Sequence, residues 1–330
     1  YGFSMVVEKM LERYKPDSMA VAWDLPGETF RHKLYPEYKG QREKKEQELY
    51  DQIPIIQNIL AAFGIPSVSV ENYEADDVIG TLAREAGEKQ FQTMIVTGDL
   101  DSLQLVNDDT RVLFFQKGIS ETKLYDEEAV KDRYGLTPSQ LIDYKALRGD
   151  PSDNLPGIAG IGEKTATDLL QRYKNIEGIF ETLPEIEEKF AKKLRGQESQ
   201  VEESKVLVTI VCDVKTGFDF DEGKRKEPNL KKLLTLYRDL EFRTLLRKHE
   251  SSEQNLGSPR LQPGKEKASI RILKSAGGFE KSFGSGLTVC VLIAEQAPDL
   301  FGATLAAAAL SDGRHTAVVM NPSKAALLEI

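Results

Sequence analysis

The stretch TMIVTGDLD, residues 93–101, joins a short apolar run to two carboxylates. The run over 93–97 predicts a buried strand, and Gly98 predicts a turn directly after it. Asp99 and Asp101 therefore lie at the carboxyl end of that strand, which is the edge where open α/β sheets bind their ligands. The run AVAW, residues 20–23, followed by Asp24, repeats the same arrangement earlier in the chain.

Strand-like and helix-like stretches alternate on both sides of this segment. The spacing of apolar residues predicts helices over 4–14, 46–63 and 75–86, and short apolar runs predict strands over 20–23, 68–70, 93–97 and 112–115. Such alternation predicts an α/β fold, with a mostly parallel sheet that is flanked by helices on both faces.

The pattern changes further along the chain. Residues 127–250 are mainly helical in character, and residues 251–269 are rich in Ser, Gly and Pro, which is typical of a linker. Apolar runs over 270–273, 287–294 and 316–320 predict strands of a second domain, which we place at 270–330.

The charge of the chain is unevenly distributed. Its net charge is −9, yet residues 31–45 hold six Lys and Arg against two Glu. A basic strip beside acidic clusters fits a metal-using enzyme that acts on a polyanion, although a solvated helix face would explain the same strip. The longest apolar runs are too short to cross a bilayer, and Cys212 and Cys290 lack metal-ligand spacing, so we expect a cytoplasmic protein with reduced thiols.

Further carboxylates gather in two places. Glu74, Asp76 and Asp77 open a predicted helix, and Asp150 and Asp153 share a loop. Each set alone has a structural explanation, because acids stabilise the first turn of a helix and Asp caps helices and turns. Several carboxylates at one sheet edge would however repel one another unless cations neutralised them. With three His in the chain, an all-oxygen ligand set favours Mg²⁺ or Mn²⁺ over zinc.

The stretch LPGIAGIGEKTA, residues 155–166, is rich in glycine and leads into a helix that we predict over 165–173. It lacks the preceding strand of a dinucleotide-binding fingerprint, and Glu163 interrupts the Gly-Lys-Thr of a Walker A loop. Two interpretations remain, a tight helix–helix turn and a helix-hairpin-helix, whose backbone N–H groups reach a DNA phosphate. We favour the second.

Six segments, taken in order, resemble the 5′-nuclease family, which includes flap endonucleases and phage 5′-exonucleases. They are AWD (22–24), FRH (30–32), EYK (37–39), YEADD (73–77), TGDLD (97–101) and residues 149–162. The resemblance runs to about residue 250. It implies a PIN-like catalytic core over 1–126, a helical DNA-binding subdomain over 127–250, and two-metal hydrolysis of DNA phosphodiesters.

The resemblance also implies roles for individual residues. The first metal would be held by Asp24, Glu74 and Asp76. The second would be held by Asp99, Asp101 and Asp153, with Asp77 and Asp150 close by. Arg31 and Lys39 would approach the scissile phosphate, and Tyr38 would either stack on a terminal base or pack in the core. The expected DNA contacts are Arg42, Gly157, Gly160, Gly162, Lys164 and Thr165, with a K⁺ ion at the hairpin.

As partners, the resemblance implies DNA with 5′ flaps, nicks or junctions, and RNA–DNA primers, during bacterial DNA replication and repair. It further implies a monomer near the nucleoid, with no membrane contact. Two other functions stay open: a catalytically impaired fragment that binds DNA junctions, and a single-strand ribonuclease with the same type of sheet.

Two departures from the family stand out. The family carries a further Asp at the end of a first strand that would precede Tyr1, so we expect a central strand and one metal ligand to be missing. Residues 270–330 resemble the start of a ribonuclease H-like 3′-5′ exonuclease domain. There Glu295 lacks the partner Asp that active versions carry, so we expect that domain to be inactive.

Overall fold

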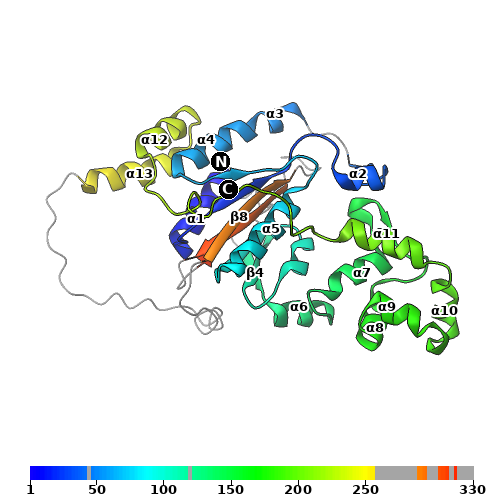
Figure 1. Cartoon of the computed structure of the whole chain (residues 1–330). Coiled ribbons are helices and arrows are strands. Elements are labelled where there is room, and N and C mark those ends of the chain that lie inside the picture. The colour runs from blue at the N-terminus through cyan, green and yellow to red at the C-terminus, as the bar shows by residue number, and fades with distance from the viewer. Residues whose placement is uncertain (43–45, 118–120, 257–287, 296–303, 312–315, 318–330) are drawn as a thin grey trace, which may run out of the picture.

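The computed structural model describes residues 1–42, 46–117, 121–256, 288–295, 304–311 and 316–317 (Figure 1). A twisted sheet lies at the centre, and a group of helices extends from one side of it. This arrangement confirms the predicted α/β class, with a helical subdomain that follows the sheet in the chain. No helix of the described residues has the length and apolar character needed to cross a membrane.

The main sheet is mostly parallel around its centre. Strand β1 pairs in parallel with β2 and β8, and β3 pairs in parallel with β4 and β8, whereas β5 and β9 run antiparallel to their neighbours. The short β10 adds to β9. The strands are β1 (Ala20–Trp23), β2 (Ser67–Val68), β3 (Gln92–Thr97), β4 (Thr110–Lys117), β5 (Glu121–Tyr125), β8 (Thr288–Glu295), β9 (Thr304–Ser311) and β10 (Thr316–Ala317).

The centre of this sheet differs from our expectation. We expected a central strand of the sheet to be missing, but β8 and β9 lie between β1 and β3 in the strand order, and Val291 of β8 is opposite both Ala20 and Ile95. The physical reason is that unpaired backbone groups inside a sheet cost about 1–3 kcal/mol each, so an apolar β-prone run satisfies both edges. Glu295, the last residue of β8, directly follows Ala294. Ala294 pairs with Trp23, the residue before Asp24.

The second domain predicted at 270–330 stays a prediction. Residues 270–273 and 318–330 lie outside the described residues, as do 257–269 of the predicted linker. The strands that are described in this part of the chain pair within the sheet of the core.

The helices fall into three groups. The core carries α1 (Gly2–Tyr14), α2 (Phe30–Leu34), α3 (Gln47–Tyr50), α4 (Gln52–Phe63) and α5 (Ala75–Glu88). The helical subdomain contains α6 (Glu127–Tyr134), α7 (Gln140–Arg148), α8 (Glu163–Tyr173), α9 (Ile176–Glu181), α10 (Glu188–Leu194) and α11 (Glu198–Val208). The chain then returns to the core, where α12 (Leu230–Asp239) and α13 (Arg243–Leu256) lie beside α4 (Figure 1).

One predicted helix is divided. We expected a single helix over 46–63, but it breaks at Asp51 into α3 and α4. Pro54 stands in the first turn of α4, where its missing N–H costs nothing, and its ring disfavours a helix continuing through it.

A single hydrophobic core joins the sheet to the helical subdomain. Met94, Ile95 and Val96 of β3 are completely buried, and the same cluster continues to Leu147 on α7 and Leu170 on α8. Because one core spans both parts, loops that come from the helical subdomain are held firmly against the carboxyl edge of the sheet.

Candidate functional site

Three carboxylates meet at the carboxyl edge of the sheet. One oxygen each of Asp101, Asp150 and Asp153 lies within 4.8 Å of the others. Asp101 opens a short 3-10 helix, η1 (Asp101–Leu105), shortly after β3. Asp150 and Asp153 come from a small hairpin in which β6 (Gly149–Asp150) and β7 (Leu155–Pro156) flank η2 (Pro151–Asp153). The structure therefore gathers the carboxylates of two loops that are about fifty residues apart.

Local hydrogen bonds fix this hairpin. The Asp150 side chain accepts hydrogen bonds from the Ser152 amide at 2.9 Å and the Ser152 hydroxyl at 2.6 Å. Gly149 has a φ of 83°, and a Cβ there would lie 2.3 Å from the Gly157 nitrogen, so only glycine fits. Asp150 is consequently held as a direct member of the cluster, where we had expected it only to support the ligands.

The charges of the cluster are unbalanced without a cation. Burial and the neighbouring Asp99 raise the pKa of Asp101 to about 7, although Lys145 opposes them. Burial also acts to raise the pKa of Asp150, but the Lys145 ammonium outweighs it and brings that pKa to about 2. Such opposed shifts are typical of crowded carboxylates that share too little positive charge.

The carboxylates expected at the first metal are arranged differently. An Asp24 oxygen accepts a hydrogen bond from the Ala75 amide at 2.6 Å, and Ser102 lies 3.5 Å from Asp76. Within the described ranges, Asp24, Glu74 and Asp76 do not meet as closely as the three carboxylates above. Asp99 likewise lies outside the close cluster, and one of its oxygens accepts a hydrogen bond from the Asp101 amide.

Glu74 and Asp24 influence each other electrostatically. Burial and the charge of Glu74 raise the pKa of Asp24. Burial would also raise the pKa of Glu74, but Lys39 and Arg31 outweigh it and lower that pKa. Glu74 is thus the carboxylate that stays ionised, with Lys39 Nζ at 2.9 Å.

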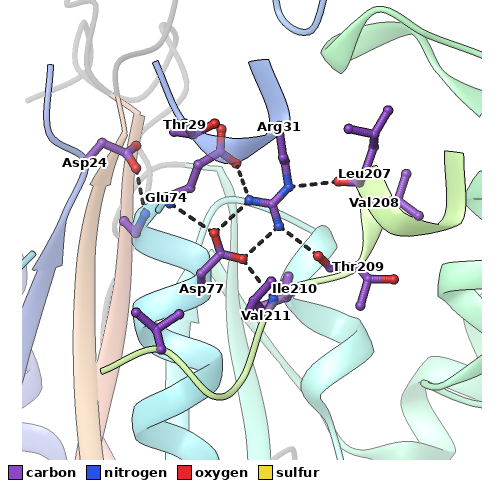
Figure 2. A network of polar contacts seen from close by, with 12 residues as sticks. Asp24, Thr29, Arg31, Glu74, Asp77, Leu207, Val208, Thr209, Ile210 and Val211 are labelled. Atoms are coloured by element: carbon purple, nitrogen blue, oxygen red, sulfur yellow. Dashed lines mark hydrogen bonds and ion pairs between the residues drawn. The ribbon is translucent and has the colours of Figure 1, made fainter. Parts of the chain in front are cut away.

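Arg31 and Asp77 form a buried ion pair, shown in Figure 2. Arg31 Nη1 and Nη2 each lie 2.7 Å from an Asp77 oxygen, and Arg31 also donates to the carbonyls of Leu207 and Thr209 at 2.8 and 2.7 Å. The amides of Glu74 and Val211 donate to the same Asp77 carboxylate. Arg31 is 2% exposed and Asp77 is fully buried.

The hydrogen-bonding groups of Arg31 and Asp77 are engaged by each other and by the backbone, and an Arg31 nitrogen also lies 3.5 Å from a Glu74 oxygen. The contact of Arg31 with a phosphate and the support of a metal by Asp77 stay predictions. The pair joins α2, α5 and the 207–211 segment (Figure 2).

Tyr38, for which base stacking and core packing were both left open, is buried. Its side chain is 2% exposed, and its hydroxyl donates to Glu74 at 3.1 Å and to Asp153 at 3.0 Å. A buried ring offers no face to a DNA base, so the packing alternative is the one that the structure supports. Tyr38 connects the two groups of carboxylates.

Two basic residues beside Tyr38 do reach the carboxylates. Lys39 pairs with Glu74, and Arg42 Nη2 lies 2.9 Å from Asp153 Oδ1. These residues are partly exposed; Arg42 pairs with a member of the acidic cluster and Lys39 pairs with Glu74, and their contact with a phosphate stays a prediction.

The glycine-rich loop packs closely and leads directly into α8. Ile158 and Ile161 are buried, and Gly160 has a φ of 81° with its carbonyl accepting from Lys193 at 2.8 Å. Gly162 caps α8 and is open to solvent, since a Cβ there would meet nothing within 4 Å. Gly157 differs, because a Cβ would lie 2.0 Å from the Arg148 carbonyl oxygen. Of the other two predicted DNA contacts, Lys164 is exposed and Thr165 is half-buried.

Our sequence reasoning missed Lys145 on α7, whose ammonium contacts Asp101 and lies 2.6 Å from Asp150. A signal was present, because Lys145 stands five residues before Asp150 at the end of a helix. It also missed the carbonyls of Leu207 and Thr209, for which no local pattern exists because they lie 176 and 178 residues from Arg31.

Comparison with known proteins places the chain in a family. Residues 1–135 match the family model of the 5′-3′ exonuclease N-terminal resolvase-like domain, and residues 136–231 match that of the 5′-3′ exonuclease C-terminal SAM fold. The chain therefore belongs to the 5′-3′ exonuclease family.

Its homologues are the N-terminal regions of DNA polymerase I. It is 42% identical over 247 residues to DNA polymerase I of Bacillus subtilis, which covers 74% of this chain and 28% of that protein. The corresponding protein of Chloroflexus aurantiacus is 42% identical over 245 residues, covering 73% and 26%. The chain thus spans under a third of the length of these relatives.

A solved structure shows the same fold. The zinc-bound T5 5′-exonuclease superposes with a TM-score of 0.56 at 22% identity, over 64% of this chain and 82% of that one. At this identity the likeness concerns the fold, and the residues of the site must carry the chemistry themselves.

Proposed function

We propose that this chain hydrolyses DNA phosphodiesters at 5′ ends and flaps, and that it needs two divalent cations, Mg²⁺ or Mn²⁺. The observation that carries the proposal is the cluster of Asp101, Asp150 and Asp153, with Arg42 beside it, in a member of the 5′-3′ exonuclease family. An all-oxygen donor set at the carboxyl edge of a parallel sheet fits these hard cations.

The residues of the site would have different roles in hydrolysis. Asp101, Asp150 and Asp153 would hold one cation, and Asp24 with Glu74 would contribute to the other. Cations held there supply a bound water of lowered pKa and neutralise charge on the reacting phosphate. Lys39 stabilises phosphate charge as a side chain that already pairs with the Glu74 carboxylate.

DNA is proposed to lie along one side of the helical subdomain. The open amino end of α8 at Gly162, with the exposed Lys164 next to it, offers backbone N–H groups to a duplex phosphate. A K⁺ ion at this hairpin, RNA–DNA primers as substrates, a monomeric state and a cytoplasmic location near the nucleoid stay predictions. So does a polymerase activity of a full-length parent protein in replication and repair.

The first prediction tests the activity. We expect the full chain to cut a 5′-flap duplex with Mg²⁺ and to stop in excess EDTA, because the acidic cluster cannot bind phosphate without cations. Calcium should support binding of the same duplex without cutting. Activity that survives EDTA would refute the metal mechanism.

The alternative functions give different results in this assay. Binding in Ca²⁺ without cutting in Mg²⁺ would instead identify a junction-binding module. Faster cutting of single-stranded RNA than of flap DNA would identify the ribonuclease alternative.

The second prediction concerns the hairpin. We expect Gly162→Val to weaken duplex binding about tenfold, because its side chain would stand where a phosphate accepts a hydrogen bond worth about 1.5–3 kcal/mol. Its melting temperature should stay close to wild type, since the position is open. Titration of a fluorescent duplex in Ca²⁺ measures the effect.

A matched variant separates binding from folding. Gly157→Ala should lower the melting temperature instead, because its Cβ would collide with the backbone of Arg148. If Gly162→Val bound duplex as tightly as wild type, the helix-hairpin-helix interpretation would be wrong.

A further inference from the structure

Lys145 lies against the acidic cluster of the site. Its ammonium contacts an Asp101 oxygen and lies 2.6 Å from Asp150 Oδ2, so it bridges two of the three clustered carboxylates. The lysine side chain is 16% exposed, and the side chains of Asp101 and Asp150 are 26% and 9% exposed. This is no flexible surface pair, because the charges meet in a partly enclosed space.

The position of this lysine is imposed by its helix. On either side of it, Tyr144 and Ala146 are buried in the core, and Leu147 is completely buried. Helix α7 then ends at Gly149, and the chain turns back through Asp150. The backbone therefore presents the lysine stem to the cluster, while four single bonds leave the ammonium able to move.

A lysine and a divalent cation would compete for the same carboxylates. The ammonium pairs with Asp101 Oδ1 and Asp150 Oδ2, so a cation bound to the cluster would compete with it for the charge of the same two carboxylates. Two positive centres a few ångströms apart in a partly buried site also repel strongly. Both cannot occupy the cluster in the geometry that the structure shows.

We propose that Lys145 is a built-in counter-ion of this cluster, which holds the carboxylates together in the metal-free protein and is displaced when a divalent cation binds. The inference rests on the cation site of the proposed function. It explains how three carboxylates remain assembled before any cation arrives, since their mutual repulsion would otherwise open the loops of 101 and 150–153. It also means that the cation pays for displacing a charge, so the site binds more weakly than its three carboxylates alone would.

The test uses Lys145→Met in the full chain, because methionine keeps most of the stem and removes the charge. We expect the metal-free variant to melt a few degrees lower than wild type. We expect its affinity for Mn²⁺, measured by calorimetry or by electron paramagnetic resonance, to rise about tenfold or more. Neither measurement depends on cutting. Lys145→Gln keeps an N–H donor without the charge, so it should show the same rise if the methionine variant folds poorly.

Lys205 provides a matched control. It also bridges two acids, Asp143 at 2.9 Å and Glu177 at 2.7 Å, but these are not members of the cluster. Lys205→Met should change stability without changing Mn²⁺ affinity.

The outcomes separate this inference from the proposed function. If wild type binds Mn²⁺ and cuts DNA but neither Lys145 variant binds more tightly, the counter-ion role is refuted and the nuclease function stands. If only the Lys145 variants bind Mn²⁺, the counter-ion role is supported and the metal-dependent function of the wild-type chain fails. If no variant binds Mn²⁺, both are refuted.

Discussion

Arg31→Met is expected to lower the free energy of unfolding by about 3–5 kcal/mol, because it leaves a buried carboxylate without its charged partner. Asp77 is fully buried, and it loses two hydrogen bonds of 2.7 Å. The carbonyls of Leu207 and Thr209 also lose their donors. Urea unfolding would measure the loss, and the single tryptophan, Trp23, is a buried fluorescent reporter in β1 next to the site.

Two further variants test whether the loss of stability comes from breaking the buried ion pair. Arg84→Met removes another arginine that contacts α5 acids and a backbone carbonyl, but its side chain is 42% exposed, so its cost should stay near 0–1 kcal/mol. Adding Asp77→Leu to Arg31→Met should recover part of the loss, because no charge then remains buried. An Arg31→Met protein as stable as wild type would show that the ion pair does not hold these elements together.

The Arg31–Asp77 ion pair matters for function because it positions neighbouring residues of the site. It ties α2 and the amino end of α5 to the 207–211 segment, and Glu74 opens α5 one residue before Ala75. Loss of the pair would therefore loosen the placement of Glu74 and of the Tyr38 hydroxyl bonded to it. We therefore expect Arg31 to act by orienting these carboxylates.

Asp101→Asn is expected to slow flap cleavage on the order of 1,000-fold, since a catalytic cation supplies several kcal/mol and about 1.4 kcal/mol corresponds to tenfold in rate. Asparagine preserves the shape of the side chain but removes one of the three clustered charges. Single-turnover cleavage of a 5′-flap duplex in Mg²⁺ measures the rate of the chemical step.

Unlike its cleavage rate, the melting temperature of the Asp101→Asn protein should not fall. The pKa of Asp101 is raised to about 7, so its ionised form is disfavoured in the folded, metal-free protein. Removing that charge should leave the melting temperature in EDTA unchanged or slightly higher. Asp126→Asn is the control, because Asp126 is not one of the clustered carboxylates and caps α6 through the Ala129 amide, where Asn caps equally well. Cleavage by Asp101→Asn at a rate near wild type would remove Asp101 from the site.

Several features of this protein were determined by short stretches of its sequence. Apolar runs that end in Asp24 and in Asp99 with Asp101 placed carboxylates at one edge of a sheet, and the alternation around them indicated the α/β class. The glycine-rich loop likewise predicted the start of α8 to within two residues. These predictions succeed because periodicity and turn chemistry act over a few neighbouring residues, which any fold must respect.

Only the tertiary structure decided which side chains face the site and which are buried beneath it. Arg31, Tyr38 and Asp77 have the residue types of a phosphate-binding and metal-binding site, yet they are buried and bonded to groups far away in the chain. Lys145, which our sequence analysis did not name, stands among the carboxylates. The central position of β8 is likewise a matter of pairing across some two hundred residues. A charged side chain has the same chemistry in either place, and its role depends on which partners the fold brings within hydrogen-bonding distance.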